Sequence, residues 1–294
     1  MGKNPFSLYD FLGYLFPGMV TLMLIVFLVH LHKTYGQSIP IDSYFRIKEF
    51  ATAIEENKVL PWLENTVLVV VIAYIAGHIT AYLSSRTIEY FSNAVLGYPS
   101  YYLLHDDKRY NIISEFFQGA KEWDICKIFY RIVVLVSLFP IVVFMISKAL
   151  RKFISRPLDD YVINSIQTKL RELSVTLNLN VPDVNSKADY HRIVMHYVYL
   201  NIPQSQRKAD NYVAIYGFLR ALTLIACLFF DYLLVSQALS INLHLSVNWQ
   251  ALGMLLIVFL LTNILYMGFV KFYRRFTLEN YMALLTEKKE IYRN

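Results

Sequence analysis

Five stretches of about twenty mostly apolar residues limit what this chain can fold into, since a helix needs about that length to cross the hydrocarbon core of a bilayer. Of the 294 residues, 56% are hydrophobic and 17% are charged, whereas a soluble globular domain has about 25% charged residues. The sequence therefore predicts an all-α, polytopic membrane protein with a small helical cytosolic portion. Its expected spans are Phe11–Leu31, Trp62–Leu83, Ile132–Leu150, Ala214–Val235 and Ala251–Val270.

The expected spans divide the chain into four parts. Residues 1–150 form an N-terminal membrane region with three hydrophobic segments and a polar connector at 86–131. Residues 151–212 form a cytosolic helical segment, because apolar residues recur there at helical spacing. Residues 213–270 form a transmembrane hairpin, and residues 271–294 form a cytosolic tail.

Lys and Arg set the expected orientation, because loops on the inner side carry an excess of these residues. The loop 236–250 has neither residue, so we expect it outside, with the basic segment 151–212 and the C-terminus inside. We favour five full crossings, which put the basic connector 86–127 and the N-terminus outside. The alternative keeps that connector inside and makes 132–150 a re-entrant hairpin, which Pro140 at its middle would permit.

The second span changes character along its length. At about 100° per residue, His78, Tyr82, Ser85 and Glu89 fall on one helical face. Polar groups inside a membrane are functional candidates, so this stripe predicts a pore lining, in which Glu89 attracts cations and His78 responds near neutral pH. In the alternative interpretation, Arg86 and Glu89 lie in the headgroup layer and His78 is a buried, hydrogen-bonded histidine.

A ridge of small residues runs beside the stripe. Ala73, Gly77 and Ala81 are spaced by four, a pattern that lets membrane helices approach closely. A ridge that contacts a neighbouring copy beside a stripe that faces an axis suits the inner ring of a homo-oligomer.

The last two spans carry three further polar candidates. Arg220 and Asp231 are eleven residues apart and share a face, with an apolar path between them. This pattern fits a gate that closes by dewetting, and equally an ordinary span with charged ends. Asn263 lies within the last apolar run, where an amide normally bonds a neighbouring helix.

The cytosolic segment and the residues that follow it offer a possible ligand site. Arg192, Arg207, Lys208 and Tyr212 supply the charge and the stacking surface that a nucleotide or oligonucleotide needs. The alternative is a basic segment that lies beside anionic lipid.

Signals of catalysis are weak. The sequence has no Gly-rich phosphate loop, no Gly-x-Ser-x-Gly and no Cys-x-x-Cys, and His105-Asp106-Asp107 has no recognisable partners for a metal site. We therefore expect no enzymatic activity, no cofactor and no metal. A lipid-modifying enzyme that uses His78 or His105 is the remaining enzymatic alternative.

Four segments together resemble a family of bacterial membrane proteins that is associated with anti-phage defence loci. They are NPFSLYDFLGYLFPG at Asn4–Gly18, YIAGHITAYLSSRTIE at Tyr74–Glu89, GYPSYYLL at Gly97–Leu104 and IYGFLRALTL from Ile215. The resemblance implies a gated-pore effector, of the kind represented by the Hailong-type channel effector.

That resemblance implies a homo-oligomeric channel in the bacterial inner (plasma) membrane, opened by a cytosolic signal such as a nucleotide oligomer. The implied partners are the lipid bilayer, copies of the same chain and a soluble defence enzyme encoded nearby. The alternative from another class is a non-conducting membrane anchor or regulator of a soluble partner enzyme.

Overall fold

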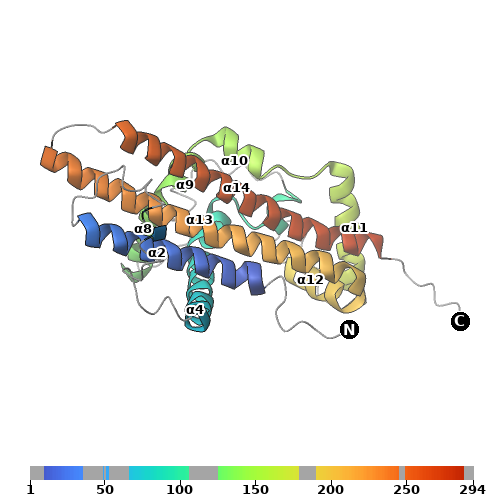
Figure 1. The fold of residues 1–294 in the computed structure, drawn as a ribbon. Coiled ribbons are helices and arrows are strands. Elements are labelled where there is room, and N and C mark those ends of the chain that lie inside the picture. Colours follow the sequence, from blue (N-terminus) through green and yellow to red (C-terminus); the bar gives the residue numbers. More distant parts are fainter. Residues whose placement is uncertain are drawn as a thin grey trace, which may run out of the picture.

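Two long antiparallel helices run the length of the molecule. The computed structural model describes residues 10–35, 49, 51–52, 66–105, 125–178, 190–244 and 249–287. In it, α13 (Pro203–His244) and α14 (Trp249–Thr286) lie side by side (Figure 1). Each is about 60 Å long at about 1.5 Å per residue, so both extend well beyond the roughly 30 Å hydrocarbon core.

The described residues confirm the predicted all-helical membrane architecture. Four helices are long and apolar enough to span a bilayer, and one bent pair of helices raises that number to five if the pair is counted as a span. The four cover Phe11–Thr34, Thr66–Tyr102, Pro203–Ala238 and Leu252–Thr286.

The first span begins with a π-helical turn. This turn, η1 (Phe11–Leu15), continues into α2 (Phe16–Tyr35), and the Phe16 N–H donates to the Phe11 carbonyl five residues earlier. Pro17 follows directly, and in a regular helix its ring would meet the carbonyl oxygen four residues back. The wider turn before it therefore accommodates a proline close to the start of the span.

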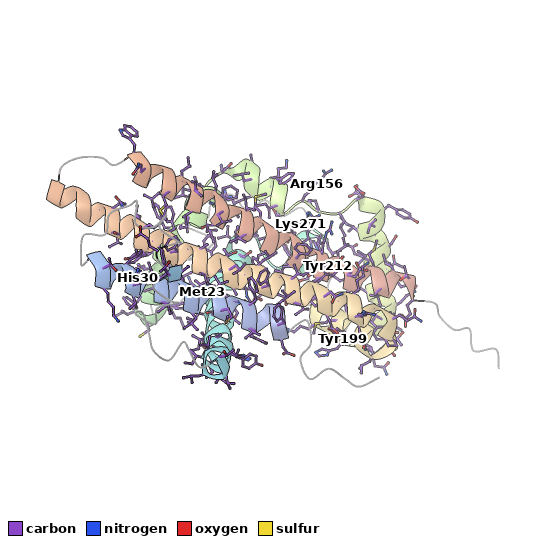
Figure 2. The ribbon with its side chains drawn as sticks, viewed as in Figure 1. Met23, His30, Arg156, Tyr199, Tyr212 and Lys271 are labelled. Atoms are coloured by element: carbon purple, nitrogen blue, oxygen red, sulfur yellow. The ribbon has the colours of Figure 1, made fainter. Side chains whose placement is uncertain are left out.

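α2 runs parallel to α13. Near its beginning, the Phe16 ring lies 5.5 Å from the Phe218 ring, and near its end Leu31 packs in one cluster with Phe230 and Leu233. We call the end of the hairpin that carries Pro203 the α12 end, because α12 (Tyr190–Asn201) directly precedes it. The beginning of α2 thus points toward the α12 end, and in Figure 2 His30 lies far from Tyr199 of α12.

The second span is a chain of short elements. It consists of α4 (Thr66–Ser84), the π-helical turn η4 (Ser85–Glu89) and α5 (Tyr90–Val95), followed by α6 (Pro99–Tyr102). α4 packs on α2 and η1 through its small residues, while Phe91 and Val95 enter the central cluster with Tyr266 and Phe269 of α14.

The third predicted span is not a straight helix. α8 (Ile125–Ser137) and α9 (Phe139–Met145) meet at 84°, and the bend falls at Leu138, where φ is −110° and ψ is 22°. Pro140 lies in the first turn of α9, where a proline needs no hydrogen-bonded N–H. The proline therefore starts a second helix.

Contacts of the bent pair match the re-entrant alternative. Arg131 near its start bonds Tyr90, and Phe139 at the bend stacks on Phe230, nearer the far end of α13. The chain then returns through α10 (Lys148–Ile154), after which the Leu158 N–H donates to the Leu103 carbonyl. The chain thus comes back toward the α12 end, and the bent pair is either a broken fifth span or a re-entrant loop.

A second hydrophobic cluster closes the α12 end. α11 (Asp160–Thr176) and α12 (Tyr190–Asn201) pack against the last turns of α14 (Figure 1). The predicted apolar stripe of α11 is buried there. The cluster consists of Leu104, Ile166, Leu170, Leu173, Val194, Val198, Tyr281, Ala283 and Leu284.

Candidate functional site

An ion pair joins two of the membrane spans. Arg220 of α13 donates through Nη1 to a carboxylate oxygen of Glu89 in η4, and the two side chains are 14% and 26% exposed. Arg220 Nε also donates to Ser84 Oγ at 3.3 Å, and Nη2 to the Ala81 carbonyl at 3.5 Å. A charge within an apolar span is costly unless it is paired, so Glu89 and Arg220 satisfy each other.

The π-helical turn explains why Glu89 faces α13. In η4 the Tyr90 N–H donates to the Ser85 carbonyl, five residues earlier, which changes the direction of the side chains after Ser85. The predicted stripe is therefore divided. His78 and Tyr82 are exposed on the outer side of α4, with Tyr82 61% exposed, whereas Glu89 turns inward to Arg220.

His78 lies among aromatic rings. Its imidazole stacks on Tyr14 of η1 with the ring centroids 3.9 Å apart, and Tyr74 meets it edge-on at 4.6 Å. The histidine thus belongs to the contact between the first two spans as well as to the exposed side of α4.

The small-residue ridge is occupied within the chain. A Cβ atom on Gly77 would lie 1.9 Å from the Tyr14 carbonyl oxygen, and one on Gly18 would lie 1.7 Å from that of Ala73. Ala73 is fully buried, and Ala81 is partly buried. In this structure the ridge lets α2 and η1 of the same chain approach α4, so it is not left open for another copy.

Asp231 and Asn263 lie in the spans without meeting the ion pair in any described contact. Asp231 is partly buried, eleven residues beyond Arg220 on α13. Asn263 is 3% exposed, and its side-chain amide donates to the Phe259 carbonyl at 2.8 Å within α14 itself. This hydrogen bond stays within α14, whereas the sequence predicted a hydrogen bond from Asn263 to a neighbouring helix.

The four predicted ligand residues do not share one described cluster. Lys208 forms an ion pair with Glu279 of α14, and the Tyr212 ring lies 6.2 Å from Phe272. Arg192 and Arg207 are exposed. Two of the four side chains thus hold α13 against α14.

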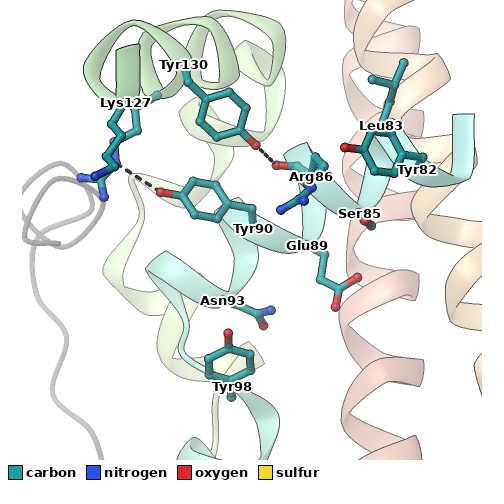
Figure 3. Close-up of a pocket in the computed structure, with 11 residues that line it drawn as sticks. Tyr82, Leu83, Ser85, Arg86, Glu89, Tyr90, Asn93, Tyr98, Lys127 and Tyr130 are labelled. Carbon is teal, nitrogen blue, oxygen red and sulfur yellow. Dashed lines mark hydrogen bonds between the residues drawn. The ribbon is translucent and has the colours of Figure 1, made fainter. Parts of the chain in front are cut away.

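A cavity of about 700 Å³ opens beside the ion pair. Figure 3 shows it between α8 on one side and η4 with α5 on the other. It is lined by Tyr82, Leu83, Ser85, Arg86, Glu89, Tyr90, Asn93, Tyr98, Lys127, Tyr130 and Arg131.

Hydrogen bonds between the two walls hold the cavity in shape. Tyr130 OH donates to the Arg86 carbonyl, and Arg131 Nε donates to Tyr90 OH at 3.2 Å. Arg131 is 8% exposed although it is charged. The sequence interpretation counted Lys127 only toward the orientation of the chain and did not single out Arg131. The spacing of Lys127, Tyr130 and Arg131, which places them on one face of α8, is the signal that could have marked the site.

The histidine–aspartate candidate is only partly described. His105 stacks on Tyr101, and its Nδ1 lies 3.1 Å from the Tyr101 carbonyl; Asp106 and Asp107 fall outside the described residues. Within the described ranges, no group of three His, Cys, Asp or Glu side chains could hold a metal ion.

Comparisons with protein-family models, curated proteins and solved structures found no match for this chain. The functional argument therefore rests on the geometry of the ion pair and the cavity beside it.

Proposed function

We propose that this chain is the subunit of a homo-oligomeric ion channel or pore, with its C-terminus on the cytoplasmic side of a bacterial inner membrane. The observation that carries the proposal is the Glu89–Arg220 pair, which joins two candidate spans at a π-helical turn. Ionisable residues within membrane spans commonly mark ion pathways, and π-helical turns are frequent at functional sites.

The exposed side of α4 supports assembly with other copies. Only 17% of the residues in the most apolar stretch of the second span are buried, the smallest share among the four candidate spans. Exposed Ile75 and Ile79 lie there beside His78 and Tyr82. In the assembled channel this mixed surface contacts neighbouring copies and contributes polar groups to the pore wall.

The ion pair is suited to act as a gate. In the closed state each charge satisfies the other. Opening separates Glu89 from Arg220 and hydrates both, and the released carboxylate then favours cations. The cost of separating a paired charge within the membrane keeps the resting channel shut.

Contacts between the spans and the α12 end provide a route for the gating signal. Tyr281 OH donates to the Ser100 carbonyl at 3.4 Å, and the Leu158 N–H donates to the Leu103 carbonyl at 3.1 Å. These contacts lie between the cluster formed by α11 and α12 and the segment that follows Glu89. A signal bound by 151–212, such as a nucleotide oligomer, can thus move η4.

The defence role follows from the resemblance noted in the sequence. A channel opened by an infection signal would depolarise the cell and stop phage replication. The protein itself then acts by conduction and not by catalysis.

Conductance in planar bilayers tests the proposal. Purified protein should give discrete single-channel steps once an extract of phage-infected cells or a nucleotide oligomer is added. Glu89→Gln should raise the open probability, because it breaks the pair, and should shift the reversal potential away from cation preference. Glu172→Gln, an exposed carboxylate of α11, is the control and should conduct as the wild type. Persistent silence with these additions, or Glu89→Gln currents identical to the wild type, would contradict it.

Exposed apolar side chains on α11 and α12 favour a second candidate function, that of a membrane anchor for a soluble partner. Tyr161, Val175 and Leu200 of α11 and α12 are at least 70% exposed. Such side chains could dock a soluble partner enzyme, for which the chain would be a non-conducting anchor or regulator. A monomer or dimer in detergent that stays silent and copurifies with a soluble enzyme would favour this candidate over the channel.

A further inference from the structure

We propose that the cavity between η4–α5 and α8 binds a phosphate group, carried by an anionic phospholipid. The channel proposal does not require such a site, and neither proposal depends on the other. The argument rests on the charges, the geometry and the apolar surroundings of the cavity.

The described lining carries an excess of positive charge. It holds three cations, Arg86, Lys127 and Arg131, and one carboxylate, Glu89. Glu89 is paired with Arg220 from the neighbouring helix. An anion that enters meets these three cationic side chains, one of which, Arg131, is buried, and electrostatic attraction is stronger at a buried group than in bulk solvent.

Arg131 is held in place before any ligand arrives, and Arg86 lies against an aromatic ring. Arg131 is buried and bonded to Tyr90 OH, and the Arg86 guanidinium lies 5.7 Å from the centre of the Tyr82 ring. The planar guanidinium matches two phosphate oxygens at once. Side chains that are already ordered lose less conformational entropy on binding, so this wall favours phosphate over a diffuse counterion.

The surroundings favour a lipid as the source of the phosphate. α8 turns Lys127 and Arg131 toward the cavity, while Ile125, Phe129 and Val136 on the same helix are exposed and apolar. Acyl chains can lie along that apolar side while the head group enters the cavity. A volume of about 700 Å³ is within the usual range of about 300–1,000 Å³ for small-molecule sites.

Binding of defined lipids to the full chain in detergent tests the proposal. Phosphatidylglycerol and phosphatidylcholine with identical acyl chains are titrated against the purified wild type, with native mass spectrometry and the thermal unfolding midpoint as readouts. We expect phosphatidylglycerol to bind at least about tenfold more tightly, because phosphatidylcholine carries its own cation. Equal affinity for the two lipids would overturn the proposal.

Two matched double variants locate the site. Arg86→Gln with Lys127→Gln removes the two exposed cations of the cavity, whereas Lys271→Gln with Arg275→Gln removes two exposed cations of α14. The first should lose about tenfold or more in affinity for phosphatidylglycerol, and the second should bind as the wild type. Equal losses in both variants would mean a general surface charge effect and would overturn the site. If the first fails to fold, the lipid comparison on the wild type still decides.

Competition with a water-soluble phosphate distinguishes a lipid from a free phosphate compound as the ligand. Glycerol 1-phosphate that competes with the lipid only at far higher concentration supports an amphiphile, with the acyl chains adding affinity. Glycerol 1-phosphate that binds as tightly as the lipid, and loses affinity in the Arg86→Gln, Lys127→Gln variant, would keep the phosphate site but overturn the lipid as its source.

Discussion

At the scale of single residues, the cost of disrupting the Glu89–Arg220 pair depends on whether one partner or both are removed. Removing one partner leaves an uncompensated charge within the span, whereas removing both leaves none. We expect Glu89→Gln or Arg220→Gln alone to lower the free energy of unfolding by about 2–4 kcal/mol, and the double variant to lose less than the sum. Denaturant unfolding in micelles measures this cycle.

The exposed Lys169–Glu172 pair on α11 is the control for that cycle. Its partners are 3.0 Å apart on one helix face, and removing either should cost about 0.5 kcal/mol or less. Strictly additive losses at Glu89 and Arg220 would show that the two side chains do not stabilise each other.

Tyr197 should make the docking of α12 sensitive to alkaline pH. Burial, together with the 2.7 Å hydrogen bond that its hydroxyl donates to Glu287, raises the pKa of Tyr197 from 10.0 to about 12. A raised pKa means that the stabilisation is fully present below pH 10 and is lost as the pH rises toward 12. The thermal unfolding midpoint of the wild type should therefore fall across that window.

In Tyr197→Phe, the thermal unfolding midpoint should fall less between pH 10 and 12 than in the wild type. Phenylalanine has no hydroxyl proton to release, so the hydrogen bond to Glu287 no longer contributes to the pH dependence. Tyr161→Phe, at an exposed position of α11, should leave the pH profile unchanged. A Tyr197→Phe profile that superimposes on the wild type would remove this contact from the alkaline transition.

At the scale of elements, the contact between the first two spans depends on two glycines. A Cβ atom at Gly18 or Gly77 would lie within 2 Å of a backbone carbonyl oxygen of the facing helix, and a backbone cannot move aside as a side chain can. Gly18→Ala and Gly77→Ala should each lower the free energy of unfolding by more than about 2 kcal/mol.

Two other glycines are internal controls, since no heavy atom lies within 4 Å of a Cβ atom at Gly217 or Gly253. Alanine there should be neutral or stabilising by up to about 1 kcal/mol, because alanine favours a helix. If all four substitutions had the same effect, the close approach of α2 to α4 would not exist in the folded protein.

The sequence predicted which segments form helices. It did not predict which side chains share a face along the whole second span. Apolar length alone placed the long spans, and the spacing of Ile166, Leu170 and Leu173 gave the buried face of α11. The stripe from His78 to Glu89 assumed a constant 3.6-residue turn, and the π-helical turn at Ser85–Glu89 breaks that assumption. Glu89 after this turn meets Arg220, which lies 131 residues away in sequence, and a helical period cannot reveal such a contact.

The cavity was hidden from sequence for a similar reason. Arg131 and Tyr90 meet across 41 residues, and Tyr130 and Arg86 across 44. A helical period relates only neighbours along one helix, so the spacing that marks one face of α8 does not reveal which helix it faces. Only the fold of the bent pair brings the two walls together.

At the scale of the whole molecule, four or five crossings fit the candidate spans, and we propose four, with the bent pair re-entrant. α2 runs parallel to α13, and the bent pair returns toward the α12 end. Under this proposal we expect Arg86, Lys127 and the last turn of α14 to lie on the same side of the membrane, as the positive-inside rule favours.

The native cysteines allow a direct check of this topology. Cys126 is exposed at the start of α8, and Cys227 is buried. A membrane-impermeant maleimide should label the protein in inverted membrane vesicles and not in intact spheroplasts, and Cys126→Ala should abolish the labelling. Labelling of Cys126 in spheroplasts would place the connector outside.

Two reporters complete the topology experiment in the Cys126→Ala background. Asp10→Cys, before the first span, should react from the same side as Cys126. Ser236→Cys, near the far end of α13, should react from the opposite side.

The length of α13 and α14 has a mechanical consequence. Both helices run without a break to the α12 end, where the last turns of α14 enter the cluster around Tyr281. A helix pair of this kind acts as a stiff lever, so a tilt of a few degrees imposed on α11 and α12 becomes a sideways displacement of several ångströms along rods about 60 Å long. Softening the lever with glycines between Lys208 and Tyr212 would let the ends move independently, and stimulus and response would become disconnected while each part stayed folded.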